Sequence, residues 1–114
     1  AGGGRDKLKR PIFGQLAENY CDHIILTDED PYDENPLSIL KEIESGFSKS
    51  EILNPKSEII LDRRKAIKKA MTLAQKNDIV VITGKGSENS IAVARGKKIP
   101  WSDKNTVLEL IKEL

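Results

Sequence analysis

Asp78-Ile-Val-Val-Ile-Thr83 is the stretch that decides the fold class, because β-branched residues fill it and a glycine-bearing loop follows at once. Such a run is typical of a strand that is buried on both faces of a parallel sheet. We therefore predict a central strand over residues 78–83.

Outward from this run, helical and strand-like apolar patterns alternate along the chain, which predicts an α/β fold with a mostly parallel sheet. Asn35 and Asp62 are expected to cap the helices that follow them, and residues 48–57 are expected to form a loop. The remaining predicted elements are helices over 12–20, 36–47, 63–74 and 103–114, and strands over 23–27, 58–61, 91–93 and 97–101.

Length and charge bound the class of protein. The 114 residues suit one domain over 1–114, and 19 Lys and Arg against 18 Asp and Glu give a net charge of +1, which requires neither nucleic acid nor an anionic membrane. One cysteine, Cys21, and one histidine, His23, exclude a disulfide framework and a Cys/His metal site and favour a reducing cytoplasm. A start on glycines with no preceding strand suggests a piece cut from a larger protein.

Two charged segments precede the midpoint of the chain. The first, residues 2–11, combines glycines with four cations that could bind carboxylate or phosphate, although a solvated basic tail would look similar. The second, residues 27–36, places five carboxylates between a strand and a helix. It is either a solvated acidic turn or the wall of a pocket that recognises an amino group.

A third segment, residues 83–89, follows the predicted central strand and carries Lys85 and Glu88. A phosphate-binding P-loop would need a glycine five residues before Gly84, and Ile79 stands there, so that motif is excluded. What remains is a turn with a cation and a carboxylate at a strand end, where ligands bind in open α/β sheets.

Five motifs stand in fixed order along the chain. They are Gly2-Gly-x-Arg-Asp-Lys-x-Lys-Arg-Pro11, Thr27-x-x-x-Pro31, Asp62-Arg-Arg-x-Ala-Ile67, Ile82-Thr-Gly-Lys-Gly-x-Glu88 and Trp101-Ser-Asp-Lys104. Together they resemble one family, the Mur ligases, and within it the enzymes that add the third amino acid to the peptidoglycan precursor peptide. The resemblance covers nearly the whole chain.

The resemblance implies a three-domain bacterial cytoplasmic enzyme. This chain would be its C-terminal domain, which is Rossmann-like and has three layers. In such ligases ATP phosphorylates a UDP-MurNAc-dipeptide and the amine of the incoming amino acid attacks the acyl phosphate. ATP and Mg²⁺ are expected to bind mainly outside this domain, which positions the amino acid. We expect no catalytic residue and no metal ligand in it, and a monomer.

The motifs also imply roles for single residues. Arg5 matches the arginine that binds a carboxylate of the incoming amino acid, a task suited to a planar bidentate donor. Gly84 and Glu88 match the carbonyl and carboxylate that hold the ammonium at the far end of its side chain. Asp6 and Lys9 match positions on the nucleotide side of the cleft. On this view Arg5 and Glu88 bind opposite ends of one zwitterion.

The acidic segment departs from the family pattern. Enzymes that add diaminopimelate carry Asp-Asn-Pro-Arg, whereas this chain has Glu29-Asp30-Pro31-Tyr32 and so lacks the arginine for a second carboxylate. We hypothesise that Asp30 and Tyr32 line the amino-acid site and that it favours lysine or ornithine over diaminopimelate. Ser87 stands where histidine is usual, and nothing in the sequence explains its effect.

Other readings stay open from the sequence. The main rival is a stand-alone α/β module that binds an amino acid without catalysis, which an upstream Gly-Lys-Thr/Ser P-loop would exclude. A folylpolyglutamate or cyanophycin type of synthetase is disfavoured by the Gly-Lys-Gly-x-Glu motif. For Cys21, His23 and Trp101 we expect structural roles, and for the cations from Arg63 to Lys69 a solvated helix face.

Overall fold

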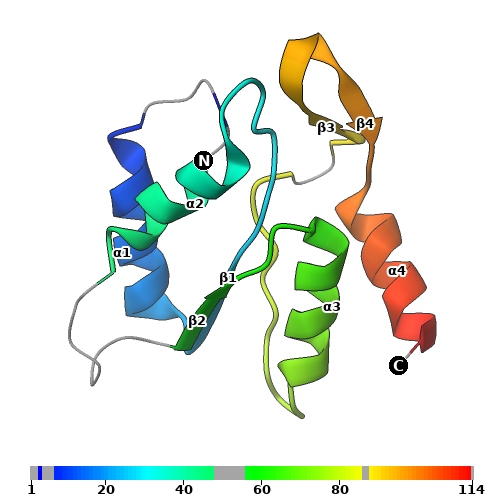
Figure 1. The fold of residues 1–114 in the computed structure, drawn as a ribbon. Helices are drawn as coiled ribbons and strands as arrows, with labels where there is room; N and C mark the ends of the chain where they lie inside the picture. Colours follow the sequence, from blue (N-terminus) through cyan, green and yellow to red (C-terminus); the bar gives the residue numbers. More distant parts are fainter. Residues whose placement is uncertain (1–2, 4–6, 48–55, 86–87, 114) are drawn as a thin grey trace.

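The computed structural model describes residue 3 and residues 7–47, 56–85 and 88–113. Its elements, in chain order, alternate between helix and strand up to the middle of the chain (Figure 1). They are α1 (Lys9–Tyr20), β1 (His23–Leu26), α2 (Pro36–Glu44), β2 (Lys56–Ile59), α3 (Arg63–Leu73), β3 (Ser90–Ala92), η1 (Ala94–Gly96), β4 (Lys98–Pro100) and α4 (Asp103–Glu113).

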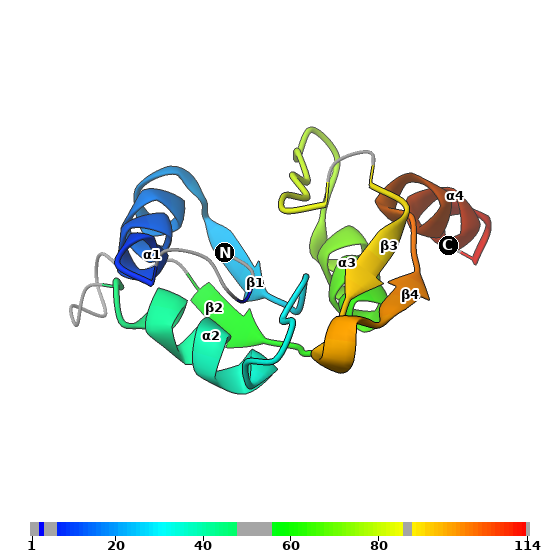
Figure 2. The ribbon, with the colours of Figure 1, turned by 90° about the horizontal axis from the view of Figure 1, so that it is seen from above.

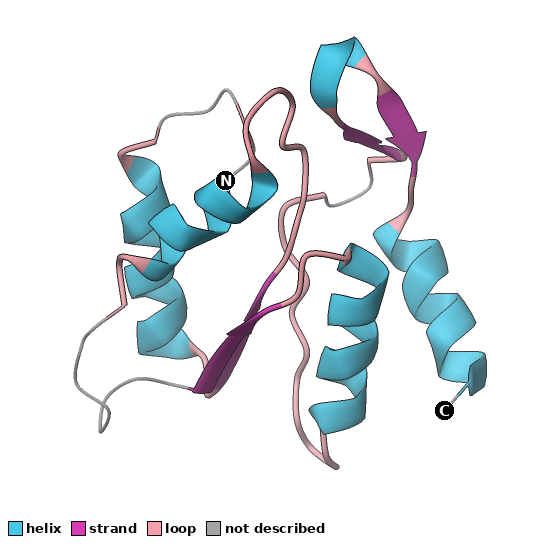
Figure 3. Ribbon diagram, viewed as in Figure 1, coloured by secondary structure: helices cyan, strands magenta, loops and turns pink. Residues whose placement is uncertain are grey.

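Two short sheets organise the described chain (Figure 3). β1 and β2 pair in parallel, with His23 opposite Lys56 and Leu26 opposite Ile59, and α2 lies in the connection between them. β3 and β4 pair antiparallel around the short helix η1. The parallel pair joined through a helix confirms the predicted α/β class.

The core lies between the parallel pair and α2. Ile24 and Leu26 point from β1 onto Leu40 of α2, because alternate residues of a strand share one face. The partly buried Ala17, Ile43, Phe47 and Ile59 pack around them. Burying such apolar side chains contributes roughly 1.5–3 kcal/mol each, which makes this cluster the main support of the N-terminal half.

The two N-terminal helices approach each other closely. Gly14 of α1 and Gly46 after α2 permit this, since a Cβ at either position would overlap backbone atoms of the other helix segment. Arg10 of α1 reinforces the contact: its guanidinium is 1% exposed and binds Glu34 Oε2 at 2.8 Å and Glu42 Oε2 at 2.7 Å. Arg10 thus binds carboxylates within the protein. It does not make the contact with a ligand carboxylate or phosphate that was considered for the basic segment, residues 2–11.

The C-terminal half is built from α3 and α4. Asp62 caps α3 by accepting the N–H of Lys65 at 2.9 Å, as predicted, and Ala66, Ile67 and Leu110 are buried. Seen from above, α1 and α2 lie on one side of the parallel pair, and α3 and α4 lie on the other (Figure 2). Leu110 thus faces the interior, whereas the adjacent Ile111 is 54% exposed.

The predicted central strand over residues 78–83 is wrong for this structure. The segment is not a strand, and Ile79 and Val81 are 87% and 74% exposed. Among the described residues, no backbone hydrogen bond joins residues 79–83 to either sheet. β-Branched residues favour extended backbone, but a strand also requires hydrogen-bonded pairing, and in the described ranges β1 and β2 pair with each other and not with this segment.

The outer face of α1, like the segment over residues 78–83, exposes apolar side chains. A two-stranded sheet is only about 10 Å wide, so it cannot cover α1 as well as α2. Four apolar side chains of α1 are therefore 45–84% exposed, namely Ile12, Phe13, Leu16 and Tyr20. None of the helices in the described ranges has the length and apolar character needed to cross a membrane.

Candidate functional site

The acidic segment is a structured loop between β1 and α2. Tyr32 has a positive φ of 52°, which turns the chain sharply. Asn35 then caps α2, its Oδ1 accepting the N–H groups of Leu37 at 2.9 Å and Ser38 at 3.3 Å. The cap holds the C-terminal end of the loop, as either interpretation of this segment requires.

Asp30 is the buried carboxylate of this loop, at 9% exposure. Its Oδ1 accepts the backbone N–H of Ala92 at 2.7 Å, and the N–H of Tyr32 donates to the Ala92 carbonyl at 3.2 Å. The N–H of Arg95 donates to Asp33 Oδ1 at 2.9 Å. These bonds fix the acidic loop to the β3–β4 hairpin, sixty residues along the chain.

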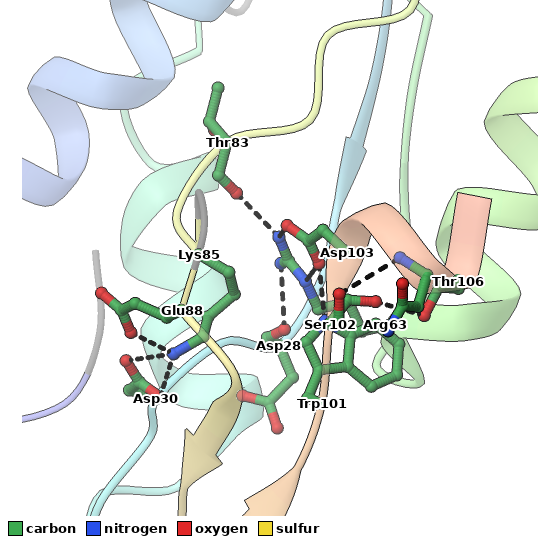
Figure 4. Close-up of polar contacts among 11 residues, drawn as sticks. Asp28, Asp30, Arg63, Thr83, Lys85, Glu88, Trp101, Ser102, Asp103 and Thr106 are labelled. Carbon is green, nitrogen blue, oxygen red and sulfur yellow. Dashed lines mark hydrogen bonds and ion pairs between the residues drawn. The ribbon is translucent and has the colours of Figure 1, made fainter. Parts of the chain in front are cut away.

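Lys85 joins the acidic loop to the third segment. Its Nζ donates to both carboxylate oxygens of Asp30, at 2.8 and 2.9 Å, and to Glu88 Oε2 at 2.6 Å (Figure 4). Burial alone would lower the pKa of the Lys85 ammonium, but the hydrogen bonds that it donates to Asp30 and Glu88 outweigh burial and raise that pKa. Lys85 is therefore a fixed, buried positive charge between two carboxylates.

Glu88 and Gly84 remain accessible around this ammonium. The Glu88 side chain is 59% exposed although one oxygen binds Lys85, and Gly84 is exposed. Gly84 has a φ of +105°, which only glycine adopts readily. A Cβ there would overlap the carboxylate of Glu29 and lie 2.7 Å from its Cδ, so the two loops are in contact.

The basic segment, residues 2–11, contacts the acidic loop through Gly3. The Gly3 N–H donates to the Asp30 carbonyl at 2.6 Å, and a Cβ at Gly3 would overlap the Pro31 carbonyl. Arg5 and Asp6 lie outside the described residues, so the predicted meeting of Arg5 with Glu88 stays a prediction.

Arg63, the first residue of α3, contacts both the acidic loop and the third segment. It was expected on a solvated helix face, and this is wrong: it is 5% exposed, whereas Lys65, Lys68 and Lys69 are exposed as predicted. Its guanidinium binds the Asp103 carboxylate and two backbone carbonyls of the loops. The pattern of α3 could not reveal this, because the partners come from distant parts of the chain.

Asp28, at the start of the acidic loop, carries the clearest titration shift of the site. Burial, the largest cause, raises its pKa to about 6, and Arg63 opposes this while Glu29 and Asp30 add to it. A carboxyl with such a pKa changes charge close to neutral pH. Shifts of this kind cluster at functional sites.

The structure thus brings together four of the predicted site residues. Asp30 and Glu88 share the Lys85 ammonium, Gly84 contacts the same loop, and Tyr32 stands on it, 41% exposed. Lys9, predicted on the nucleotide side, is exposed at the start of α1 and has no described contact with them.

The sequence-based prediction missed three polar residues that build this site, namely Arg63, Lys85 and Asp103. One signal was available for Lys85. Five carboxylates in one short loop need a nearby cation, and Lys85 was the cation in the third segment. We find no comparable signal for Asp103, which binds Arg63 from forty residues away.

Comparisons with known proteins place the chain in one family. The family model described as "Mur ligase, glutamate ligase domain" matches residues 1–86. The UDP-N-acetylmuramoyl-L-alanyl-D-glutamate--2,6-diaminopimelate ligase of Aquifex aeolicus is 46% identical over 111 residues, which cover 97% of this chain and 22% of that protein. The UDP-N-acetylmuramyl-tripeptide synthetase of Borrelia garinii is 43% identical, over 98% of this chain and 22% of its own length.

A solved structure is similar in three dimensions as well. The structure of a UDP-N-acetylmuramoyl-L-alanyl-D-glutamate--2,6-diaminopimelate ligase superposes with a TM-score of 0.88 at 36% identity and covers 99% of this chain. The chain spans only 22% of that protein, as it does of the relatives above. The matched part is therefore one portion of a much longer enzyme in each of these proteins.

Proposed function

Because the chain belongs to the Mur ligase family, we propose that it is the amino-acid-binding domain of an ATP-dependent ligase that adds the third amino acid to UDP-MurNAc-dipeptide. One observation supports this most. The two loops that the family motifs assign to the incoming amino acid are held together by Lys85, with Glu88 and Gly84 left accessible.

The charges around Lys85 suit an ammonium ligand. Glu29, Asp30 and Glu88 supply three carboxylates against the single charge of Lys85, and Glu88 keeps most of its side chain in solvent. A carboxylate can accept several hydrogen bonds, so Glu88 can bind Lys85 and a substrate ammonium together. The role of this domain is then proximity and charge complementarity for the attacking amino acid.

We infer further that the ligase prefers lysine or ornithine to diaminopimelate. Tyr32 stands where ligases for diaminopimelate place an arginine, and the nearest described polar groups on its loop are carboxylates. Tyrosine carries no positive charge, so Tyr32, which stands at a backbone turn with a positive φ, offers no cation to a second carboxylate. Asp30 contributes indirectly, because its carboxylate is engaged by Lys85 and by the N–H of Ala92.

ATP and Mg²⁺ are proposed to bind mainly in other parts of the intact ligase. The residues described here do not fit them: in these ranges there is no group of three or more His, Cys, Asp or Glu side chains that could hold a metal ion. The third segment also lacks the glycine spacing of a P-loop. We assign this domain no step that passes through either group.

The test is to assay the intact ligase with lysine, ornithine and diaminopimelate, following phosphate release that depends on UDP-MurNAc-dipeptide. We expect the highest kcat/KM with lysine or ornithine. Faster turnover with diaminopimelate would refute the inferred preference, and no turnover with any of the three would refute the ligase function. The latter result, together with calorimetric binding of an amino acid, would favour the stand-alone binding module.

Tyr32→Arg provides a sharper version of this test, with Tyr32→Phe as its matched control. A new bidentate arginine–carboxylate contact contributes about 1.5–3 kcal/mol, so use of diaminopimelate relative to lysine should rise roughly 10- to 100-fold. Tyr32→Phe should leave the ratio unchanged. An equal ratio in the two variants would show that position 32 does not contact the amino acid.

A further inference from the structure

Arg63 forms hydrogen bonds with three separate segments of the chain from a side chain that is 4% exposed. We propose that Arg63 is a positioning residue for the amino-acid site, which fixes the backbone of both substrate-binding loops without touching the substrate. This inference rests on the proposed function and extends it to a residue that the family motifs left without a role.

The Arg63 guanidinium donates hydrogen bonds to one carboxylate and to two backbone carbonyls. Nε and Nη2 donate to the two oxygens of Asp103, both at 2.8 Å. Nη2 also donates to the Thr83 carbonyl at 2.9 Å, and Nη1 donates to the Asp28 carbonyl at 3.3 Å (Figure 4). Only a planar group with several diverging N–H donors reaches three acceptors placed in this way.

One carbonyl belongs to the residue next to a proposed substrate contact, and the other belongs to the loop that packs on that contact. Thr83 directly precedes Gly84, whose carbonyl is assigned to the substrate ammonium. Asp28 directly precedes Glu29, whose carboxylate packs on Gly84. A shift of either carbonyl therefore moves the accessible backbone and carboxylate groups of the site, and misplacement of a binding group by about 1 Å is costly.

Arg63 matters more because other restraints on Thr83 are few. In the described ranges, residues 79–83 make no backbone hydrogen bond with either sheet, and Ile79 and Val81 point into solvent. The bond from Arg63 Nη2 to the Thr83 carbonyl therefore fixes the end of this segment, together with the bonds that Lys85, two residues further on, donates to Asp30.

The position of Arg63 is itself secured by α4. Asp103, the first residue of α4, also accepts a hydrogen bond from Trp101 Nε1 at 2.6 Å. Ser102 begins the helix by accepting the N–H of Asn105 on its Oγ at 3.1 Å and the N–H of Thr106 on its carbonyl at 3.0 Å. The carboxylate that orients Arg63 is therefore held by the start of a helix.

Arg64 provides a matched control on the same helix. It also bridges α3 and α4, with Nη1 at 2.8 Å from Glu109 Oε2 and Nη2 at 3.3 Å from Glu113 Oε1. Its side chain is 40% exposed, however, and has no described contact with the site loops. If arginines on α3 merely joined the two helices, lysine substitutions at 63 and 64 would have similar effects.

The experiment compares Arg63→Lys and Arg64→Lys in the intact ligase. For Arg63→Lys we expect KM for the amino acid to rise at least about tenfold, which is about 1.4 kcal/mol of binding free energy, with KM for ATP and for UDP-MurNAc-dipeptide within about twofold of wild type. Hydrogen exchange should become faster in the peptides that span residues 28–33 and 83–89. Arg64→Lys should change neither quantity.

Two results would overturn the inference: an unchanged amino-acid KM in folded Arg63→Lys, or equal proportional losses for all three substrates. If Arg63→Lys does not fold, Asp103→Asn replaces it, since it keeps an acceptor and removes the charge. We then expect the same selective rise in amino-acid KM, and its absence refutes the proposal. Wild-type activity on the three amino acids tests the ligase function separately, so the two failures are distinguishable.

Discussion

Replacing Lys85 with methionine tests whether the buried ammonium holds the site together. The substitution keeps the length and apolar stem of the side chain and removes the charge. Asp30, 9% exposed, then keeps the N–H of Ala92 but loses both bonds to Nζ. Removing one partner of a buried pair costs about 3–5 kcal/mol, because the other charge stays buried.

The second partner of Lys85 adds little to this cost. Glu88 is 59% exposed, and an ion pair to such a group contributes about 0–1 kcal/mol. Because Asp30 keeps the hydrogen bond from the N–H of Ala92, we expect the low end of the range, about 3 kcal/mol. That is a large part of the 5–15 kcal/mol that stabilises a typical domain, so the midpoint of urea unfolding should fall clearly.

The assay is equilibrium urea unfolding followed by circular dichroism, with two controls. Lys41→Met removes an exposed ion pair with Glu44, at 3.5 Å, and should cost less than about 0.5 kcal/mol. The double variant Asp30→Asn/Lys85→Met removes both buried charges and should be more stable than Lys85→Met by at least about 1 kcal/mol. A loss below about 1 kcal/mol in Lys85→Met, or no recovery in the double variant, would refute this reasoning.

Two further predictions concern the same loops. Since the pKa of Asp28 is raised to about 6, the folded chain binds more protons than the unfolded chain between about pH 4 and 6, and stability falls as pH rises through that window. Asp28→Asn should remove this decline, on the order of 1 kcal/mol after discounting for solvent at the partly exposed group, and identical pH dependence of the urea midpoint in both proteins would contradict it. Gly84→Ala should cost about 2 kcal/mol and raise the amino-acid KM, because of its φ of +105° and its overlap with Glu29. Gly96→Ala, with a φ of +68° and nothing within 4 Å, should cost about 1 kcal/mol and leave KM unchanged, so equal effects at both glycines would show that the Glu29 contact is irrelevant.

Local patterns predicted most elements of the fold. The cap at Asn35 followed by proline located the start of α2, and Asp62 located the start of α3, because capping depends on a few neighbouring residues. The strands β1, β3 and β4 lie where apolar runs predicted them, within one residue at each end. β2 begins two residues before the predicted strand, as is common at element ends.

Patterns failed where an interaction between distant segments decides the outcome. The run at residues 78–83 has the composition of a buried strand, yet pairing depends on where another strand places its backbone groups, and no such pairing forms here. The cations of α3 looked alike in sequence, but only Arg63 lies opposite Asp103 and the carbonyls of two loops. Neither result is encoded within a window of ten residues.

The candidate site divides in the same way. The sequence by itself determined the family and the three charged or glycine-bearing segments, since these depend on residue types in fixed order. The roles that the family motifs imply for Gly84 and Glu88 stay predictions. Only the tertiary structure decided that Lys85 neutralises Asp30 and that Arg63 holds the loops from beneath. The physical reason is that the energy of a buried charge depends on which opposite charges lie within a few ångströms, and folding, not sequence order, sets those distances.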